Sequence, residues 1–388
     1  MKIDSVTRDA LEMVIRHKLP FVLFALPGKD SADFYTSIVG PSGCSPALDN
    51  DTDDCFFINF FDNDEPYTAT VPFRYTAAEI LKMFHPTWWN QPNPEIRPRV
   101  SATYRASYHD AFSHIIPRLK ADGGKVVLSR HRTIFASRHL IDIVEEYFSL
   151  TDNTFRYLCY TPETGVWLGS TPELLLESDR SGREVRTMAL AGTRPADVTG
   201  PWDGKNIYEQ SLVTEFIAET LKKEGLDVNV GELSDKRFVN IRHLCTEITA
   251  RGDIDVPALL SELSPTPAVA GYPREEALED ISRYESHRRL CYGGYVGVRI
   301  DGSYKAYVNL RCCFMAPGAL EERYFGWLCN LYAGGGIVAE SKEEEEWDET
   351  TAKTDALAKI LFGSDKDSPF EGAVLNPRKI DIIDGMYI

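Results

Sequence analysis

Apolar residues occur along the 388-residue chain in short runs at first and later in longer segments with helical spacing. The runs at 21–26 and 55–61 predict strands, broken by Asp, Gly and Pro. From Ser101 the pattern changes, because residues 107–124 predict a helix that ends at two glycines and 125–134 predict a strand. Four more short strands with aromatic and β-branched residues are predicted at 155–162, 165–170, 173–178 and 184–192.

Two long helices are predicted beyond these strands. Residues 205–223 carry apolar side chains near one face, and residues 341–361 open with Ser and a run of Glu, which suits a helix N-terminus. The charged segment 1–18 predicts another short helix. Strands, helix, strands and helix in this order favour an α+β fold with a large antiparallel sheet, rather than a doubly wound parallel sheet.

Composition and charge narrow the classes of function. Apolar residues make up 43% of the chain, so an ordinary globular core is expected. The formal net charge of -17 argues against a nucleic-acid partner, whose phosphates would be repelled over most of the surface. An anionic substrate would therefore depend on a metal ion or on a few well-placed Lys and Arg side chains.

The cysteines and the early apolar runs indicate where the protein resides. Eight cysteines are scattered without a CxxC pair, and the chain shows no secretory leader, so we expect reduced thiols in a cytoplasmic protein. The longest early apolar run, Phe21 to Leu26, is far shorter than the roughly 20 residues of a membrane span. Membrane insertion is not expected.

The last predicted helix carries the first candidate chemistry. Glu346, Glu349 and Lys353 are three and four residues apart and share one face. A solvated helix face with a Glu–Lys pair is the simpler interpretation. The dense carboxylates from Glu343 to Glu349 also repel one another, and a divalent cation would relieve that repulsion.

Two glycine-bearing segments could form a binding site or a plain turn. Gly334, Gly335 and Gly336 could bring backbone N–H groups close to an anion and adopt positive φ, or could form a tight turn between strands. The segment Ala189–Pro195 is more simply explained as a turn.

Two isolated charged residues are also candidates. Lys125, at the start of an apolar strand, is a solvent-facing lysine or, if it points inward, a desolvated base. Glu173, flanked by Pro and three Leu, is a surface residue or a carboxyl group kept protonated by an apolar wall.

The order of these pieces resembles a known family. From Lys125 onward the chain is similar to the chorismate-utilising enzymes, which include isochorismate, salicylate, anthranilate and aminodeoxychorismate synthases. The matching stretches, in the family's order, are KVVLSR, GVWLGSTPELLL, TMALAGTRP, KNIYEQSLV, RHLCTEI, LSPTPAVAGYPREEA, YESHRRLCYGGYVG, VNLRCC, AGGGIV and EEEWDETTAK.

The resemblance implies which reaction to expect. Members that use ammonia carry Gln at the position of Lys125, and the aminodeoxychorismate branch carries a nucleophilic Lys at the position of Ala191. Lys at 125 with Ala at 191 is the pattern of water addition. The expected activity is that of an isochorismate synthase, an isomerase that adds water at C2 of chorismate and removes the C4 hydroxyl.

The family's residue roles are carried over position by position. Lys125 would be the base and Glu173 the acid, and Mg²⁺ would be held by Glu209, Glu346 and Glu349. Arg311, Tyr292 and the amides of Gly334, Gly335 and Gly336 would hold the enolpyruvyl carboxylate. The ring side would be lined by Ala191, Gly192, Thr193, His243, Thr246 and Lys353.

Some positions depart from the family pattern. Gln210 stands where the family has His after Glu209, Asn206 stands in place of a frequent carboxylate, Ser264 replaces a usual His, and Leu290 replaces a common Gly. The expected division of the chain is a variable N-terminal part of the same sandwich at 1–95, a chorismate-binding core at 96–363 and a tail at 364–388.

Three alternatives remain open. A salicylate synthase would use the same Lys125 and Glu173 and then eliminate pyruvate. An inactive chorismate-binding subunit would not need these residues intact, and an anthranilate-type enzyme would need the absent Gln and a glutaminase partner. Menaquinone and siderophore biosynthesis both begin with isochorismate, and menaquinone supply is preferred here. We expect a bacterial, cytoplasmic monomer without an obligatory protein partner.

Overall fold

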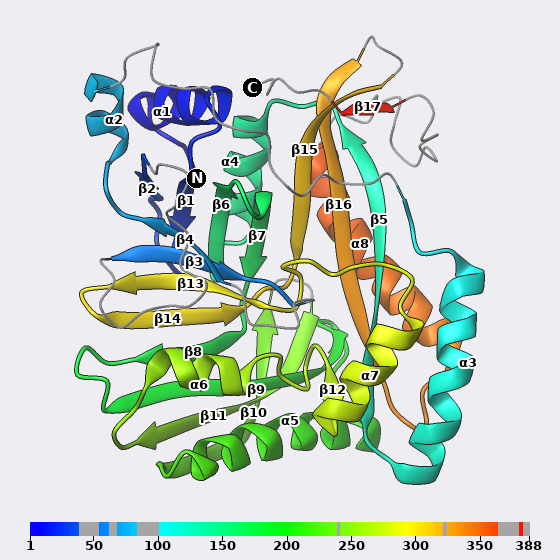
Figure 1. The fold of residues 1–388 in the computed structure, drawn as a ribbon. Coiled ribbons are helices and arrows are strands. Elements are labelled where there is room, and N and C mark those ends of the chain that lie inside the picture. Colours follow the sequence, from blue (N-terminus) through cyan, green and yellow to red (C-terminus); the bar gives the residue numbers. More distant parts are fainter. Residues whose placement is uncertain are drawn as a thin grey trace.

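The computed structural model describes residues 1–38, 54–61, 68–83, 101–238, 241–320, 324–363 and 380–382. Its helices lie on the outside of two large sheets (Figure 1). Their bounds are α1 Ser5–Arg16, α2 Ala77–Met83, α3 Arg105–Asp122, α4 Leu140–Leu150, α5 Gly204–Lys223, α6 Val256–Leu263, α7 Arg274–Tyr284 and α8 Glu343–Phe362.

Both sheets are antiparallel, and their strands run nearly crosswise to each other in Figure 1. In spatial order, the first sheet contains β12 Gly271–Tyr272, β5 Lys125–Ala136, β16 Tyr324–Ile337, β15 Cys312–Leu320, β7 Gly165–Thr171, β6 Phe155–Thr161, β1 Phe21–Ala25 and β2 Asp33–Thr36, with β17 Ile380–Ile382 beside β15. The second contains β10 Asp227–Phe238, β11 Ile241–Arg251, β9 Glu184–Pro195, β8 Leu174–Ser178, β14 Ser303–Val308, β13 Tyr295–Ile300, β3 Cys55–Asn59 and β4 Thr68–Pro72. The expected α+β antiparallel sandwich is confirmed.

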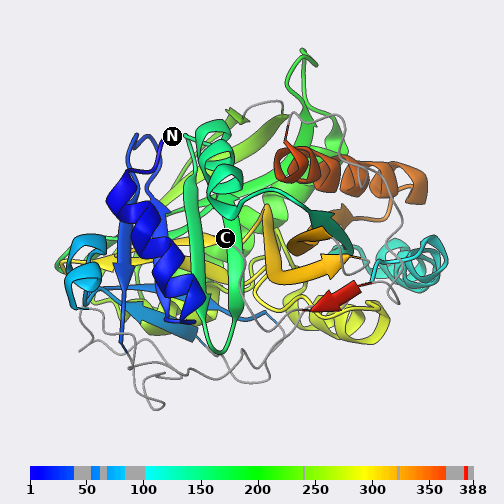
Figure 2. The same cartoon turned by 90° about the horizontal axis from the view of Figure 1, so that it is seen from above.

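The sheets are apolar on both faces because neighbouring residues along a strand point in opposite directions. In β7, Trp167 packs in the core between the sheets and Leu168 packs in the core beneath the helices. In β16, Tyr332 packs in the core between the sheets and Leu331 packs in the core beneath the helices. Helices α1, α4 and α8 cover the first sheet, and α5 and α6 cover the second. Viewed from above, α1 lies at one end of the molecule and α3 and α8 at the other (Figure 2).

The two long helices match their predicted ranges closely. Asp203 caps α5, because its side chain accepts a hydrogen bond from the Asn206 amide, and four glutamates occupy the first turn of α8. Both expected glycine turns are wrong. Residues 189–195 continue strand β9, and Gly334–Gly336 lie in strand β16, paired with β5, where extended backbone replaces the expected positive φ.

Other expectations have mixed outcomes. Strands β1 to β4 of the first 95 residues extend both sheets, and the proposed division into three parts stays a prediction. The polar, Pro-rich stretch at 85–98, which the sequence predicts to be a connection, lies outside the described residues. The seven described cysteines are buried, and none of the described helices is long and apolar enough to span a membrane.

A buried ion pair joins the segment after α7 to β5. Glu285 and Arg289 are both almost completely shielded from solvent, and Arg289 Nε donates to Glu285 Oε2 at 2.9 Å. Arg289 also donates to the carbonyl oxygens of Val269 and Val127 at 2.6 and 2.7 Å, and Glu285 accepts from the Ser129 amide at 2.7 Å. The guanidinium of Arg289 therefore donates hydrogen bonds to three segments that are separate in the sequence.

Arg289→Met is expected to lower the free energy of unfolding by about 3–5 kcal/mol, because it leaves the Glu285 carboxylate buried without a counter-ion. The control is Lys342→Met, whose partner Glu345 is exposed and whose loss should cost at most about 1 kcal/mol. Urea denaturation of both variants at one pH measures the difference. Equal, small effects would contradict the importance of the buried pair.

Candidate active site

One pocket lies where β5, β9, β11 and β16 approach helices α5 and α8. The lining includes all but two of the residues predicted from the sequence. Those present are Lys125, Glu173, Ala191, Gly192, Thr193, Glu209, His243, Tyr292, Arg311, Gly334, Gly336, Glu346, Glu349 and Lys353.

Lys125 points inward. Gly123 ends α3 with a positive φ, and Lys125 begins β5 two residues later with 1% of its side chain exposed. Its Nζ lies 2.7 Å from Glu209 Oε1 on α5. Only a glycine at 336 leaves space for Lys125 and Glu209 against β16, because a Cβ there would lie 2.4 Å from Glu209 Oε1 and 2.9 Å from Lys125 Cε. Of the two interpretations of Lys125, the structure shows the inward-pointing one.

Glu173 is buried at the link between β7 and β8. Burial raises the pKa of its carboxyl group to about 8, although the charges of Lys125 and Arg311 act in the opposite direction. Glu173 is therefore largely protonated at neutral pH. Arg311 has a left-handed backbone with a φ of 46°, an unfavourable conformation for a residue with a side chain. Its carbonyl oxygen is held by the hydroxyl of Tyr147 and the amide of Ser170.

A bulge in β9 shapes another wall of the pocket. The register with β11 shifts at Gly192, whose φ is +70°, so this glycine is an extra residue in the strand. The Thr193 amide donates to Asn206 Oδ1 on α5 at 3.1 Å. A Cβ at Gly192 would contact the same asparagine at 3.1 to 3.2 Å, so the bulge and the helix fit closely.

His243 completes this wall in a neutral form. Its Nδ1 lies 3.0 Å from the carbonyl oxygen of Gly192 and 3.2 Å from Thr193 Oγ1. Because a carbonyl oxygen only accepts, Nδ1 carries the proton. Burial, together with the nearby charges of Arg311 and Lys353, lowers the pKa of His243 to about 3.

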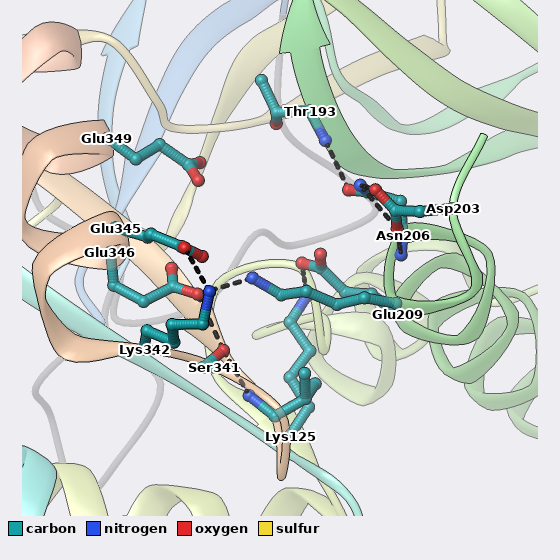
Figure 3. Close-up of polar contacts among 12 residues, drawn as sticks. Lys125, Thr193, Asp203, Asn206, Glu209, Ser341, Lys342, Glu345, Glu346 and Glu349 are labelled. Atoms are coloured by element: carbon teal, nitrogen blue, oxygen red, sulfur yellow. Dashed lines mark hydrogen bonds and ion pairs between the residues drawn. The ribbon is translucent and has the colours of Figure 1, made fainter. Parts of the chain in front are cut away.

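Helix α8 supplies two carboxylates, each held by a lysine. Glu346 Oε1 accepts hydrogen bonds from Lys205 Nζ and from Ser341 Oγ, both at 2.7 Å. Glu349 pairs with Lys353 at 2.7 Å, and Lys353 also donates to the carbonyl oxygen of Gly334. Figure 3 shows Glu346 and Glu349 facing Glu209 and Asn206 across one space.

The predicted metal ligands are not drawn together into one cluster. Within the described part of the chain, no three His, Cys, Asp or Glu side chains are grouped closely enough to hold a metal ion. Glu209, Glu346 and Glu349 instead neutralise Lys125, Lys205 and Lys353 one by one. The donor chemistry still fits magnesium, which keeps several water ligands and commonly needs only one or two protein carboxylates.

Two predicted residues do not line the pocket. Thr246 is buried in β11, where its hydroxyl accepts a hydrogen bond from Gln210 Nε2 at 2.9 Å. Gly335 alternates to the opposite face of β16 from its neighbours, and a Cβ there would lie 3.0 Å from Glu346 Oε2. The strand therefore divides the three consecutive glycines between its two faces.

Sequence reasoning did not include Lys205 and Tyr332 among the site residues, although both line the pocket. Lys205 lies four residues before Glu209 on α5, and this spacing could have placed it on the same helix face. Tyr332 directly precedes the Ala-Gly-Gly-Gly segment, but only the structure shows its ring stacked on Tyr292, with centroids 5.4 Å apart.

Comparison with known proteins identifies similar sequences. A family model described as chorismate binding enzyme matches residues 90–362. The chain is 33% identical over 216 residues to isochorismate synthase MenF of Escherichia coli, a match that covers 53% of this chain and 47% of that protein. The chain thus spans about half the length of this relative. It is 31% identical to putative isochorismate synthase MenF of Mycobacterium tuberculosis, over 76% of this chain and 82% of that protein.

Solved structures show the same fold. The menaquinone-specific isochorismate synthase MenF from Escherichia coli superimposes with a TM-score of 0.70 at 21% identity, covering 92% of this chain and 91% of the other. Anthranilate synthase component I from Streptococcus pneumoniae superimposes with a TM-score of 0.57 at 15% identity, covering 92% and 86%.

Glu173→Gln is expected to make stability less dependent on pH. The carboxyl group has a pKa of about 8 in the folded protein and an ordinary value of 4.5, so between these values the folded state binds more protons than the unfolded state. The stabilising effect of protonation is therefore complete below pH 4.5 and is lost as the pH rises through 8. Denaturant titrations of both proteins across this range measure the effect, and parallel pH profiles would contradict it.

Proposed function

The chain belongs to the family of chorismate-binding enzymes, and from this premise we propose that it is a magnesium-dependent isochorismate synthase. The observation that carries the proposal is the presence of Lys125 and Glu173 in one pocket, both buried. Glu173, with a pKa of about 8, can donate a proton near neutral pH, and Lys125 is the group proposed to accept one.

The charges of the pocket suit an anionic substrate. Lys125, Lys205, Lys353 and Arg311 line it together with Glu209, Glu346 and Glu349, while Glu173 is largely protonated at neutral pH. A divalent cation and a dicarboxylate add equal and opposite charges, so both could enter together without changing this balance. Chorismate is such a dicarboxylate.

In the proposed reaction, Lys125 Nζ accepts a proton from water, and the water oxygen forms a bond with C2 of chorismate. Glu173 donates its proton to the C4 hydroxyl, which leaves as water while the ring double bond shifts. One water enters and one leaves, so the reaction is an isomerisation. The proton returns from Lys125 to Glu173 through solvent before the next cycle.

Lys125 is joined to the proposed metal site by Glu209, whose Oε1 lies 2.7 Å from Lys125 Nζ. Magnesium held by Glu209, Glu346 and Glu349 would supply positive charge to the ring carboxylate of the substrate. Arg311, Tyr292 and the backbone amides of the glycine segment would hold the enolpyruvyl carboxylate.

The proposed product can supply two biosynthetic routes. Isochorismate is the precursor in both menaquinone and siderophore biosynthesis, and the relatives include MenF enzymes and a vibriobactin-specific isochorismate synthase of Vibrio cholerae. We propose supply of menaquinone biosynthesis by a cytoplasmic monomer.

Chromatography of the purified protein with chorismate tests the reaction. Isochorismate is expected to accumulate toward equilibrium with Mg²⁺, to be absent with EDTA, and to form without release of pyruvate. Salicylate with stoichiometric pyruvate would instead support a salicylate synthase. No turnover would indicate a chorismate-binding protein without this activity.

Lys125→Ala and Glu173→Ala are each expected to lower kcat about 10²- to 10⁴-fold, the usual contribution of a general base or acid. Glu177→Gln is the control for Glu173, because Glu177 lies on β8 four residues later and pairs with Arg186 and Lys305 outside the pocket. Lys120→Ala, on the exposed side of α3, is the control for Lys125. Full activity in either site variant would reject the assignment of that role.

A further inference from the structure

Arg130 on β5 contacts helix α8 at one well-defined place outside the pocket lining. Its Nη1 lies 2.8 Å from the carbonyl oxygen of Trp347, 2.8 Å from Thr350 Oγ1 and 2.9 Å from Thr351 Oγ1. All three acceptors are uncharged. Arg130 therefore acts on the position of this helical turn and does not neutralise one of its carboxylates.

The flat face of the Arg130 guanidinium packs on an aromatic ring. Its central carbon lies 3.2 Å from the centroid of the Trp347 ring, which meets the Tyr108 ring edge-on with centroids 5.3 Å apart. Arg105 lies over the Trp347 ring as well, at 4.8 Å, and pairs with Glu343 on the first turn of α8. Edge hydrogen bonds and face stacking together require a planar cation, which lysine cannot supply.

The turn held by Arg130 is the one that carries the proposed metal ligands. Trp347, Thr350 and Thr351 lie among Glu346 and Glu349 on α8, and Thr350 Oγ1 donates to the carbonyl oxygen of Glu346 at 3.0 Å. The helix also lies tightly against β16, since a Cβ at Gly335 would be 3.0 Å from Glu346 Oε2 and 3.4 Å from Thr350 Cγ2. A small slide or rotation of α8 would therefore displace both carboxylates.

We propose that Arg130 is a positioning residue that sets the placement of α8 and thereby the geometry in which Glu346 and Glu349 bind a divalent cation. The inference rests on the proposed function, because it takes these glutamates as magnesium ligands. Groups that orient metal ligands from outside the coordination shell affect metal affinity or activity by about 10- to 100-fold when they are removed. Arg130 occupies such a place without contacting the pocket itself.

The test uses Arg130→Met and Arg130→Lys with Arg132→Lys as the matched control. Arg132 lies two residues further along β5 and pairs with Asp355 on the same helix, beyond the proposed ligands. Isothermal titration calorimetry with Mg²⁺ alone measures affinity, and the Mg²⁺ dependence of kcat and of KM for chorismate is measured in parallel. Arg130→Met should weaken Mg²⁺ binding about 10- to 100-fold. Arg130→Lys should weaken it less, and Arg132→Lys should leave it unchanged.

The outcomes separate the inference from the proposed function. Wild-type protein that neither binds Mg²⁺ nor forms isochorismate would overturn both. Active wild-type protein together with wild-type Mg²⁺ affinity in Arg130→Met would overturn only the inference, as would equal weakening by the Arg132→Lys control. If Arg130→Met does not fold, Thr351→Val decides, because it removes one acceptor from an accessible side of α8. Weaker Mg²⁺ binding by that variant supports the inference, and unchanged binding overturns it.

Discussion

Each lysine of the pocket is held by a glutamate from a helix, and the arrangement of the pocket depends on these pairs. Lys125 comes from the first sheet and Glu209 from α5, while Lys205 of α5 pairs with Glu346 of α8. The pairs therefore connect two helices that cover different sheets. Buried charges are stable only when they are compensated, so the placement of α5 relative to α8 and the charge of the pocket cannot change independently.

The strand between these helices explains how both reach one cavity. Beyond Leu331, β16 is paired with β5 alone, because its pairing with β15 ends there. Its glycines lack side chains on both faces, so Lys125 and Glu209 approach from one side and Glu346 from the other. Side chains at Gly335 and Gly336 would occupy the space that the charged groups now fill. The glycines thus allow neighbouring side chains to approach the backbone closely within a regular strand.

Much of the fold could be predicted from local patterns, whereas the site could not. The apolar face of α5, the run of Glu that begins α8 and the aromatic and β-branched content of β6 to β9 follow from residue type, because a helix or strand must direct its apolar side chains toward a core. Lys125 and Glu173 gave no comparable signal, since a charged residue at a strand end is usually exposed. Their place in the site came from the family resemblance. Residues distant in sequence, such as Lys205 and Glu346, meet only through the packing of helices on different sheets, and the hydrogen bond from Gln210 to Thr246 likewise depends on how α5 packs on β11.

The cysteines have a consequence for the study of the protein in solution. All seven that the structure describes are shielded from solvent within strands and turns of the sandwich. A thiolate reacts with an alkylating reagent only when solvent reaches it. The rate of alkylation at these positions would therefore report how often the sheets separate, residue by residue, without an introduced label. Cys159 and Cys291 lie in the core between the sheets and Cys329 lies in the core beneath the helices, so their relative rates would show which layer opens first.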